Sequence, residues 1–132
     1  MSSINQDAPI ATVEEFRSAL LATRDWNGIS PMQLRMLQAQ CQAPGCAISP
    51  AQMAAQLNMK SLNTASARYG AFARAIAEKL GYAPPQKAKG PPCWWFTLST
   101  SRPAIEKAGN AGVEWIMRPE LVAALRSMRW VV

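Results

Sequence analysis

The sequence predicts a single domain that is mainly helical and carries one β-hairpin. Apolar residues recur at helical spacing over most of the chain, and Ser or Thr stands where several of these patterns begin. Two aromatic-rich segments, 93–99 and 113–117, alternate instead and favour strands. A chain of 132 residues can enclose one hydrophobic core but is short for two. We expect a flexible tail over residues 1–11 and one domain over 12–132.

Capping residues predict where the first three helices begin. Thr12 is followed three residues later by Glu15, which is the spacing of a capping box. Ser30 and Ser49 are each followed by proline, which is favoured at the first helical position. Asn27-Gly28 and Pro44-Gly45 end the first two helices. The positions expected to face inward are Val13, Phe16, Leu20, Leu21, Leu34, Leu37, Cys41, Met53, Ala54 and Leu57.

The longest predicted helix spans residues 63–80, with Ser61 or Asn63 as its N-cap and Gly81 as its C-cap. Its core face combines Ala65, Tyr69, Phe72, Ile76 and Leu80. The opposite face carries Asn63, Ala67, Gly70, Ala71 and Arg74 and is therefore slim. Alanine there can simply reflect helix propensity, but a glycine inside a helix costs about 1 kcal/mol. Gly70 indicates either close approach of a DNA duplex or close packing of another helix.

The last third of the chain predicts a hairpin and a closing helix. A Pro/Gly/Lys-rich loop, 83–92, precedes a hairpin over residues 93–117 with a polar connection at 100–112. Alternation would place Trp94 and Trp95 on opposite faces. The residues expected to share a face within each strand are Trp94, Phe96 and Leu98, and Val113, Trp115 and Met117. A helix follows from Pro119, with Leu121, Val122, Leu125 and Met128 inward.

The composition argues against an enzyme or a metal protein. The chain has no histidine, its eight acidic residues are scattered, and its glycines match no phosphate-binding loop. Cys41, Cys46 and Cys93 are too few and too widely spaced for a zinc site, so we expect reduced thiols. No segment resembles a membrane span or a secretory signal. We expect a non-enzymatic cytoplasmic protein without cofactor or metal.

Positive charge is concentrated in the second half of the chain. The net charge is +6. Residues 1–59 contain three basic and four acidic residues (−1), whereas residues 60–132 contain eleven basic and four acidic residues (+7). This asymmetry fits a polyanionic partner such as nucleic acid, and it fits a solvated basic surface equally well.

The order of elements decides which of these two interpretations we favour. A short helix, a tight link, a long helix and a two-stranded hairpin follow one another as in a winged helix-turn-helix, where the second helix of the pair enters the major groove of double-stranded DNA. Asn63, Thr64 and Arg68 would then carry base preference, while lysines and arginines contact phosphates. The predicted DNA-binding residues are Lys60, Ser61, Asn63, Thr64, Ala67, Arg68, Arg74, Lys87, Lys89, Arg102 and Lys107.

The segments "SPAQMAAQL", "NTASARYGAFARAIAEKLGY" and "WWFTLS" with "VEWIMRPELVAAL" resemble a bacterial winged-helix-like domain. The chain is similar in this way to the N-terminal reader domains of modification-dependent HNH endonucleases. The resemblance runs from about Pro31 to Val132, and its most recognisable part is Asn63, Tyr69-Gly70 and Leu80-Gly81. It implies DNA binding that responds to cytosine modification. The nuclease is missing, since an HNH site requires histidine.

A protein-interaction module is the competing interpretation. Trp94, Trp95 and Trp115 cluster in the predicted hairpin and could form a docking surface for a protein partner. The protein would then be an adaptor or an inhibitor, and a homodimer is a further option. One continuous basic surface would favour DNA, whereas scattered charge beside an open apolar patch would favour a protein.

Overall fold

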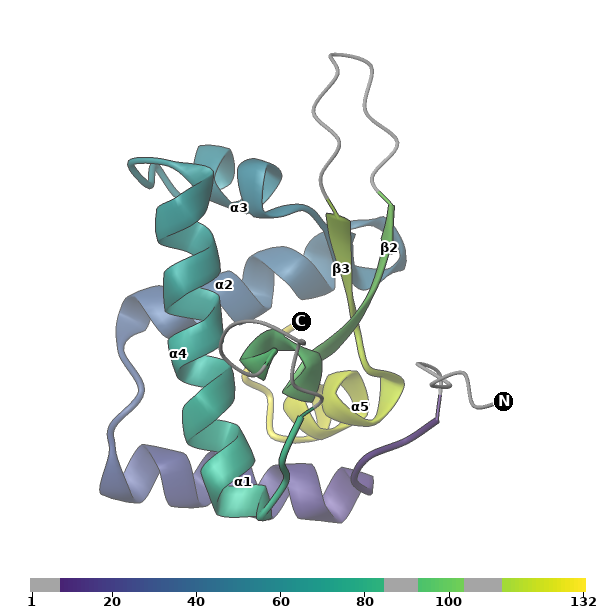
Figure 1. The fold of residues 1–132 in the computed structure, drawn as a ribbon. Coiled ribbons are helices and arrows are strands. Elements are labelled where there is room, and N and C mark those ends of the chain that lie inside the picture. The colour runs from purple at the N-terminus through teal and green to yellow at the C-terminus, as the bar shows by residue number, and fades with distance from the viewer. Residues whose placement is uncertain (1–7, 85–92, 104–112) are drawn as a thin grey trace.

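Five α-helices and a small antiparallel sheet form the described part of the chain (Figure 1). The computed structural model describes residues 8–84, 93–103 and 113–132. The elements are α1 (Val13–Trp26), α2 (Pro31–Gln42), the 3₁₀ helix η1 (Pro44–Cys46), β1 (Ala47–Ile48), α3 (Pro50–Gln56), α4 (Leu62–Leu80), the 3₁₀ helix η2 (Trp94–Thr97), β2 (Ser99–Pro103), β3 (Val113–Met117) and α5 (Pro119–Ser127). None of these helices has the length and apolar character needed to cross a membrane.

The helix starts follow the predicted caps. The Thr12 hydroxyl accepts from the Glu15 N–H at 3.1 Å, and the Glu15 carboxylate accepts from the Thr12 N–H at 2.7 Å. Ser30 and Ser49 form equivalent capping boxes, each with a glutamine three residues later. Ser61, and not Asn63, is the N-cap of α4. The prediction of inward-facing residues is wrong for Leu21 on α1, which is 36% exposed because it lies off the stripe of Phe16 and Leu20. Leu34 on α2 is only partly buried, while Met36 and Leu37 are buried.

The sheet has the strand order β1–β3–β2, and both pairings are antiparallel. β3 is therefore central, and the two-residue β1 is an element that the sequence did not reveal. Trp115 and Met117 of β3 face the core at 2% exposure each. The intervening Ile116 lies on the other face, opposite Thr100 of β2.

The prediction of a strand over residues 93–99 is wrong. Residues 94–97 form the 3₁₀ helix η2, in which the Phe96 N–H donates to the Cys93 carbonyl at 3.0 Å. η2 packs against α4, and both Trp94 and Trp95 are partly buried there, so no strand alternation separates them. The hairpin consequently begins at Ser99 and comprises β2, β3 and a tip that lies outside the described residues. The predicted connection over 100–112 is wrong for residues 100–103, because they pair with β3.

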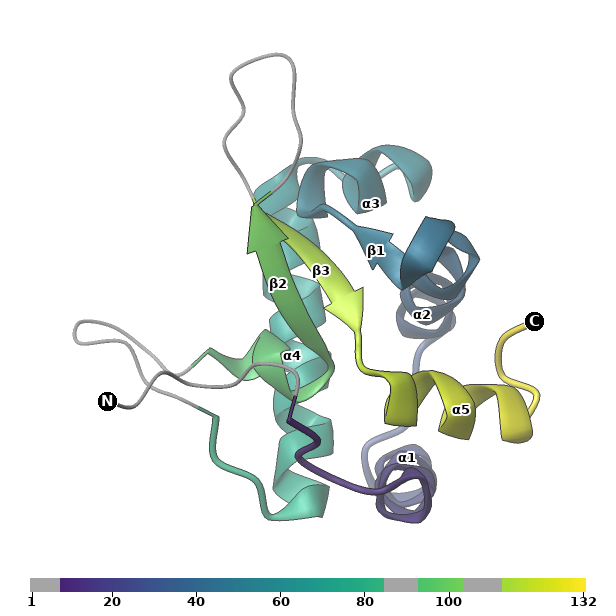
Figure 2. The same cartoon turned by 90° about the vertical axis from the view of Figure 1, so that its right-hand side faces the viewer.

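The elements divide between two ends of the molecule. α3, the start of α4 and the tip-facing ends of β2 and β3 lie at one end, whereas α1 and α5 pack together at the other (Figures 1 and 2). α4 spans the distance between these ends. Its buried Tyr69 ring stacks on Trp115 with centroids 4.0 Å apart and planes 7° apart, which joins α4 to the sheet.

The buried Arg118, directly after β3, ties the first described residues to the core. Its guanidinium donates to the Phe96 carbonyl at 3.0 and 3.1 Å and to the Ala8 carbonyl at 3.1 Å. Ala11 is 7% exposed. Residues 8–11 of the expected tail thus lie against the domain, and residues 1–7 lie outside the described part.

The buried thiol of Cys41 on α2 should lower the folding stability of the protein at alkaline pH. Burial raises the pKa of its thiol from 9.0 to about 11, with a further contribution from Cys46. The unfolded chain then releases this proton at lower pH than the folded protein does, so stability is intact below pH 9 and falls as the pH rises towards 11. The full loss is about 3 kcal/mol. We expect Cys41→Val to flatten the decline between these pH values in urea unfolding, while Cys93→Val leaves it unchanged.

Candidate nucleic-acid interface

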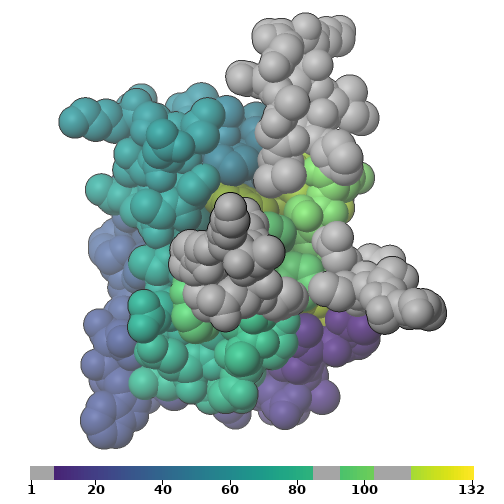
Figure 3. Space-filling view, viewed as in Figure 1, coloured from purple at the N-terminus to yellow at the C-terminus, as the bar shows by residue number. Residues whose placement is uncertain are grey.

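The α3–α4 turn, the first half of α4, the last residues of β2 and the first of β3 lie at the same end of the molecule (Figure 1). In the space-filling view, the outward side of α4 reaches the surface from this end downward (Figure 3). Ala67, Arg68, Ala71 and Arg74 are exposed there. The slim helix face predicted from the sequence is therefore a solvent-facing surface.

Gly70 lies beside this slim face and has open space around it. A Cβ atom added at Gly70 would meet no atom within 4 Å. Packing against another described element is therefore not the reason for this glycine. The helix conformation itself does not require glycine either, because Gly70 does not have a positive φ.

The start of α4 is free of negative charge. Its first turn has no acidic residue, so the positive end of the helix dipole is not neutralised by a side chain. Between Asp25 and Glu78 the sequence contains four basic residues and no acidic one. α2, α3 and nearly all of α4 fall within this interval.

The two cations nearest the start of α4 are Lys60 and Arg68. Lys60 and Arg68 are exposed, and neither forms an ion pair with a described residue. Arg68 and Ala71 border a small hollow whose other wall is the beginning of α2, including Ser30 and Gln33. Arg68 therefore lies on the flank of α4 that faces α2.

Two other predicted cations are engaged within the protein. Arg74 contacts Glu78 at 3.4 Å and lies 5.2 Å from the centroid of Trp94. Arg102 on β2 pairs with Glu114 on β3 at 2.7 Å. Both side chains remain more than half exposed, so they can still meet a ligand, but each would exchange an existing partner for it.

Three predicted contacts, Lys87, Lys89 and Lys107, lie outside the described residues. Lys87 and Lys89 precede η2 in the chain, so they belong to the connection between α4 and η2 and not to the hairpin. Lys107 falls in the hairpin tip. Contact of these three lysines with DNA therefore stays a prediction.

At the start of α4, Ser61 and Thr64 contact each other at the helix cap, whereas Asn63 is exposed beside them. The Ser61 hydroxyl accepts from the Thr64 N–H at 3.3 Å and lies 3.3 Å from the Thr64 hydroxyl. Ser61 therefore serves the helix end. Asn63 is exposed in the first turn, and Thr64 is partly exposed, so both can be reached from solvent.

A buried polar cluster connects α4 to α2 and to the hairpin. The Tyr69 hydroxyl donates to the Gln40 Oε1 at 2.7 Å and lies 2.5 Å from the Ser99 hydroxyl. The Gln40 amide donates to Ser99 Oγ at 3.1 Å and to the Trp115 carbonyl at 3.0 Å. We call Gln40, Tyr69, Ser99 and Trp115 the polar hub. It fixes the angle of the hairpin relative to α4, since it bonds both.

The polar hub was missed in the sequence, although one signal was present. Gln40 lies between Leu37 and Cys41 on the inward stripe of α2, where a polar residue requires a buried partner. Gln40 and Ser99 are 0% exposed and Tyr69 is 1% exposed. Burial raises the pKa of Tyr69, and its hydrogen bonds to Ser99 and Gln40 oppose that rise only in part. The hydroxyl therefore stays protonated and can donate.

The tryptophans do not form the cluster on the hairpin that the sequence predicted. Trp115 is buried in the hub, and Trp94 and Trp95 are partly buried outside the hairpin. The most exposed tryptophan is Trp26, at 83%, with Lys79 Nζ 6.0 Å from its ring centroid. It ends α1 and lies away from the hairpin.

No family model, curated protein or solved structure matches the chain. The described residues also contain no group of three or more Cys, Asp or Glu side chains that could hold a metal ion. The function proposed below therefore rests on the geometry and charge of the chain and on the resemblance stated above.

Proposed function

We propose that the protein is a non-enzymatic double-stranded DNA-binding protein of the winged-helix type. The observation that carries the proposal is the outward side of α4. It combines small side chains, an open Gly70 and a helix start without acidic residues. Lys60 and Arg68, which form no ion pair with a described residue, lie near this helix start. A slim, positively charged helix can bring its backbone close to base edges in a major groove.

The topology supports this assignment. Helix α2, strand β1, helices α3 and α4 and strands β2 and β3 follow in the order of a winged helix-turn-helix, and β1 joins the sheet at the edge of the hairpin. In such a domain α3 positions α4, and α4 is the recognition helix. The resemblance of the chain, from about Pro31 to Val132, to reader domains points the same way.

The residues divide into those that give affinity and those that give preference. Lys60 and Arg68 neutralise phosphates on either side of the groove, with Arg74 and Arg102 adding weaker contacts because they already have partners. Asn63 and Thr64 meet base edges. We include sensitivity to cytosine methylation in the proposal, on the resemblance to modification readers alone.

The deciding experiment is fluorescence anisotropy with labelled duplexes, unmodified and cytosine-methylated, over a salt series. We expect affinity to fall steeply with salt, and the slope of log K against log salt gives the number of phosphates contacted. Different affinities for the two duplexes would support modification reading. Absence of binding at low salt would overturn the DNA proposal and favour a protein partner.

Gly70 gives a prediction that separates stability from binding. Gly70→Ala should stabilise the fold by about 0.5–1 kcal/mol, because alanine has the higher helix propensity and the added methyl meets nothing. Gly70→Gln should instead weaken DNA binding, since a long side chain would occupy the space that the duplex approaches. Thermal unfolding and anisotropy measure the two effects.

The matched control for Gly70→Gln is Ala123→Gln. Ala123 is exposed on α5, at the other end of the molecule, and gains the same side chain. We expect it to bind DNA like the wild type. Equal affinities of Gly70→Gln and Ala123→Gln would contradict contact between this part of α4 and the duplex.

A further inference from the structure

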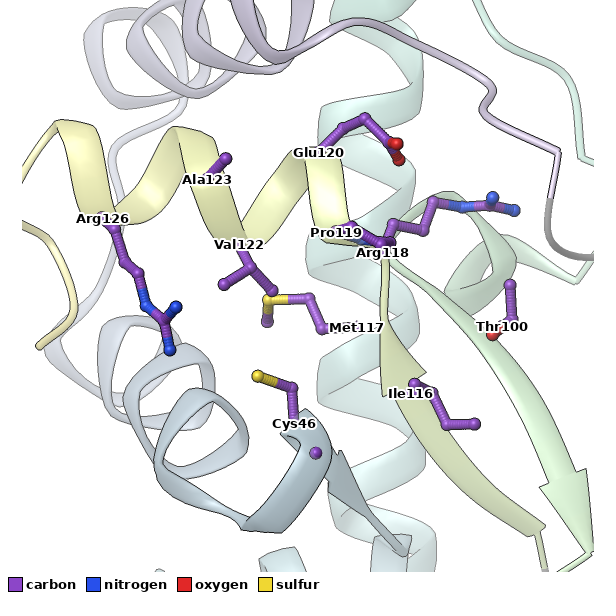
Figure 4. A pocket seen from close by; sticks show the side chains of 11 residues that line it. Cys46, Thr100, Ile116, Met117, Arg118, Pro119, Glu120, Val122, Ala123 and Arg126 are labelled. Carbon is purple, nitrogen blue, oxygen red and sulfur yellow. The ribbon is translucent and has the colours of Figure 1, made fainter.

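A groove of about 680 Å³ lies between α5, the outer face of the sheet and η1, apart from the DNA-binding surface proposed above (Figure 4). Its volume is in the range of small-molecule sites. Ile116 and Met117 come from β3, Val122 and Ala123 from α5, and Cys46 from η1. The groove is thus built by three elements that are far apart in the sequence.

The groove floor is apolar. Met117 and Val122 are 2% and 9% exposed, and they form a surface continuous with the hydrophobic core. Ile116 extends this surface along the outer face of β3. An apolar floor of this kind favours the hydrocarbon part of a ligand.

One charge is directed at the groove. In Figure 4 the Arg126 side chain extends from α5 towards Cys46, along one end of the groove, whereas the side chains of Arg118 and Glu120 point away from it. The Arg118 guanidinium is occupied by the Phe96 and Ala8 carbonyls. Arg126 forms no hydrogen bond or ion pair with a side chain in the described segments.

We propose that this groove binds a small organic carboxylate with an apolar chain or ring. The planar Arg126 guanidinium matches a carboxylate in two parallel hydrogen bonds, and the apolar part of the ligand lies on Met117, Val122 and Ile116. The charge complementarity selects an anion over a neutral compound of the same shape. This proposal is independent of DNA binding.

Two probes of equal chain length test the proposal: octanoate and octanol. Titration of the ¹⁵N-labelled full chain should shift the amide signals of Ile116, Val122 and Arg126, with octanoate binding at least about tenfold more tightly than octanol. Arg126→Gln should remove this preference while leaving the weaker apolar binding in place. Arg35→Gln, an exposed arginine on α2 outside the groove, should retain it.

A second variant tests the location. Ala123 is exposed on the groove wall, so Ala123→Trp can fill the groove without disturbing the core, and we expect it to abolish octanoate binding. Equal affinity for octanoate and octanol, an unchanged preference in Arg126→Gln, or wild-type octanoate binding by Ala123→Trp would each overturn the proposal. No measurement here uses DNA, so a failure of the DNA proposal would not affect the result.

Discussion

Replacing Lys60, Arg68 and Arg74 together by alanine is expected to weaken duplex binding by more than tenfold at moderate salt and to reduce the salt slope by about 3. Lys60 and Arg68 should account for most of the loss, because Arg74 already contacts Glu78 and Trp94. Single variants measured by anisotropy would show this order. An unchanged affinity of the triple variant would remove α4 as the DNA-binding element.

The control for this variant removes the same charge elsewhere. Arg24, Lys79 and Arg126 lie on α1, the last turn of α4 and α5, at the end of the molecule opposite α3. Replacing all three by alanine lowers the net charge by the same amount as the Lys60, Arg68 and Arg74 variant does. We expect only a small reduction in affinity, because long-range attraction is screened within about 8–10 Å at physiological salt. Similar losses in both triple variants would indicate unspecific attraction and not a defined interface.

The second large effect is expected in the polar hub. Tyr69→Phe keeps the ring stacked on Trp115 but leaves Gln40 and Ser99 without the hydroxyl, which should cost about 1–3 kcal/mol of unfolding free energy. Gln40→Leu also leaves the Trp115 carbonyl without the hydrogen bond from Gln40, and it should lower the unfolding free energy by about 2–4 kcal/mol. Urea unfolding measures both values.

The double variant shows whether the hub acts as a unit. Tyr69→Phe and Gln40→Leu share a hydrogen bond, so their combined cost should be smaller than the sum of the single costs by about 1 kcal/mol. Tyr82→Phe is the control, since Tyr82 is only partly buried outside the hub. Additive costs would show that the Gln40 and Tyr69 bonds are energetically separate.

The helix boundaries could be predicted because their causes are local. The Thr12 box, the Ser30 and Ser49 caps and the left-handed Gly81 each depend on a few neighbouring residues. The mainly helical character and the hairpin followed from these boundaries and from the alternation in β3. Such signals are contained in the sequence itself.

The errors arose where tertiary contacts decide the local structure. "WWFT" has strand propensity, yet packing of η2 against α4 makes it a 3₁₀ helix. β1 has two residues, too few to show any periodicity. The Arg74–Trp94 and Arg102–Glu114 contacts were also unforeseeable, because Trp94 and Glu114 reach these arginines only in the folded chain. The Arg74–Glu78 pair, in contrast, joins positions i and i+4 of one helix.

The pairing of β1 with β3 has a consequence for synthesis of the protein. Ala47 and Ile48 lie opposite Ile116 and Trp115, so the sheet cannot close until residues 113–117 have left the ribosome. Until then the inward side of α4 around Tyr69 lacks the aromatic ring that covers it. A nascent chain interrupted before Val113 would present this apolar surface to chaperones and proteases, even though all its capped helices were already complete.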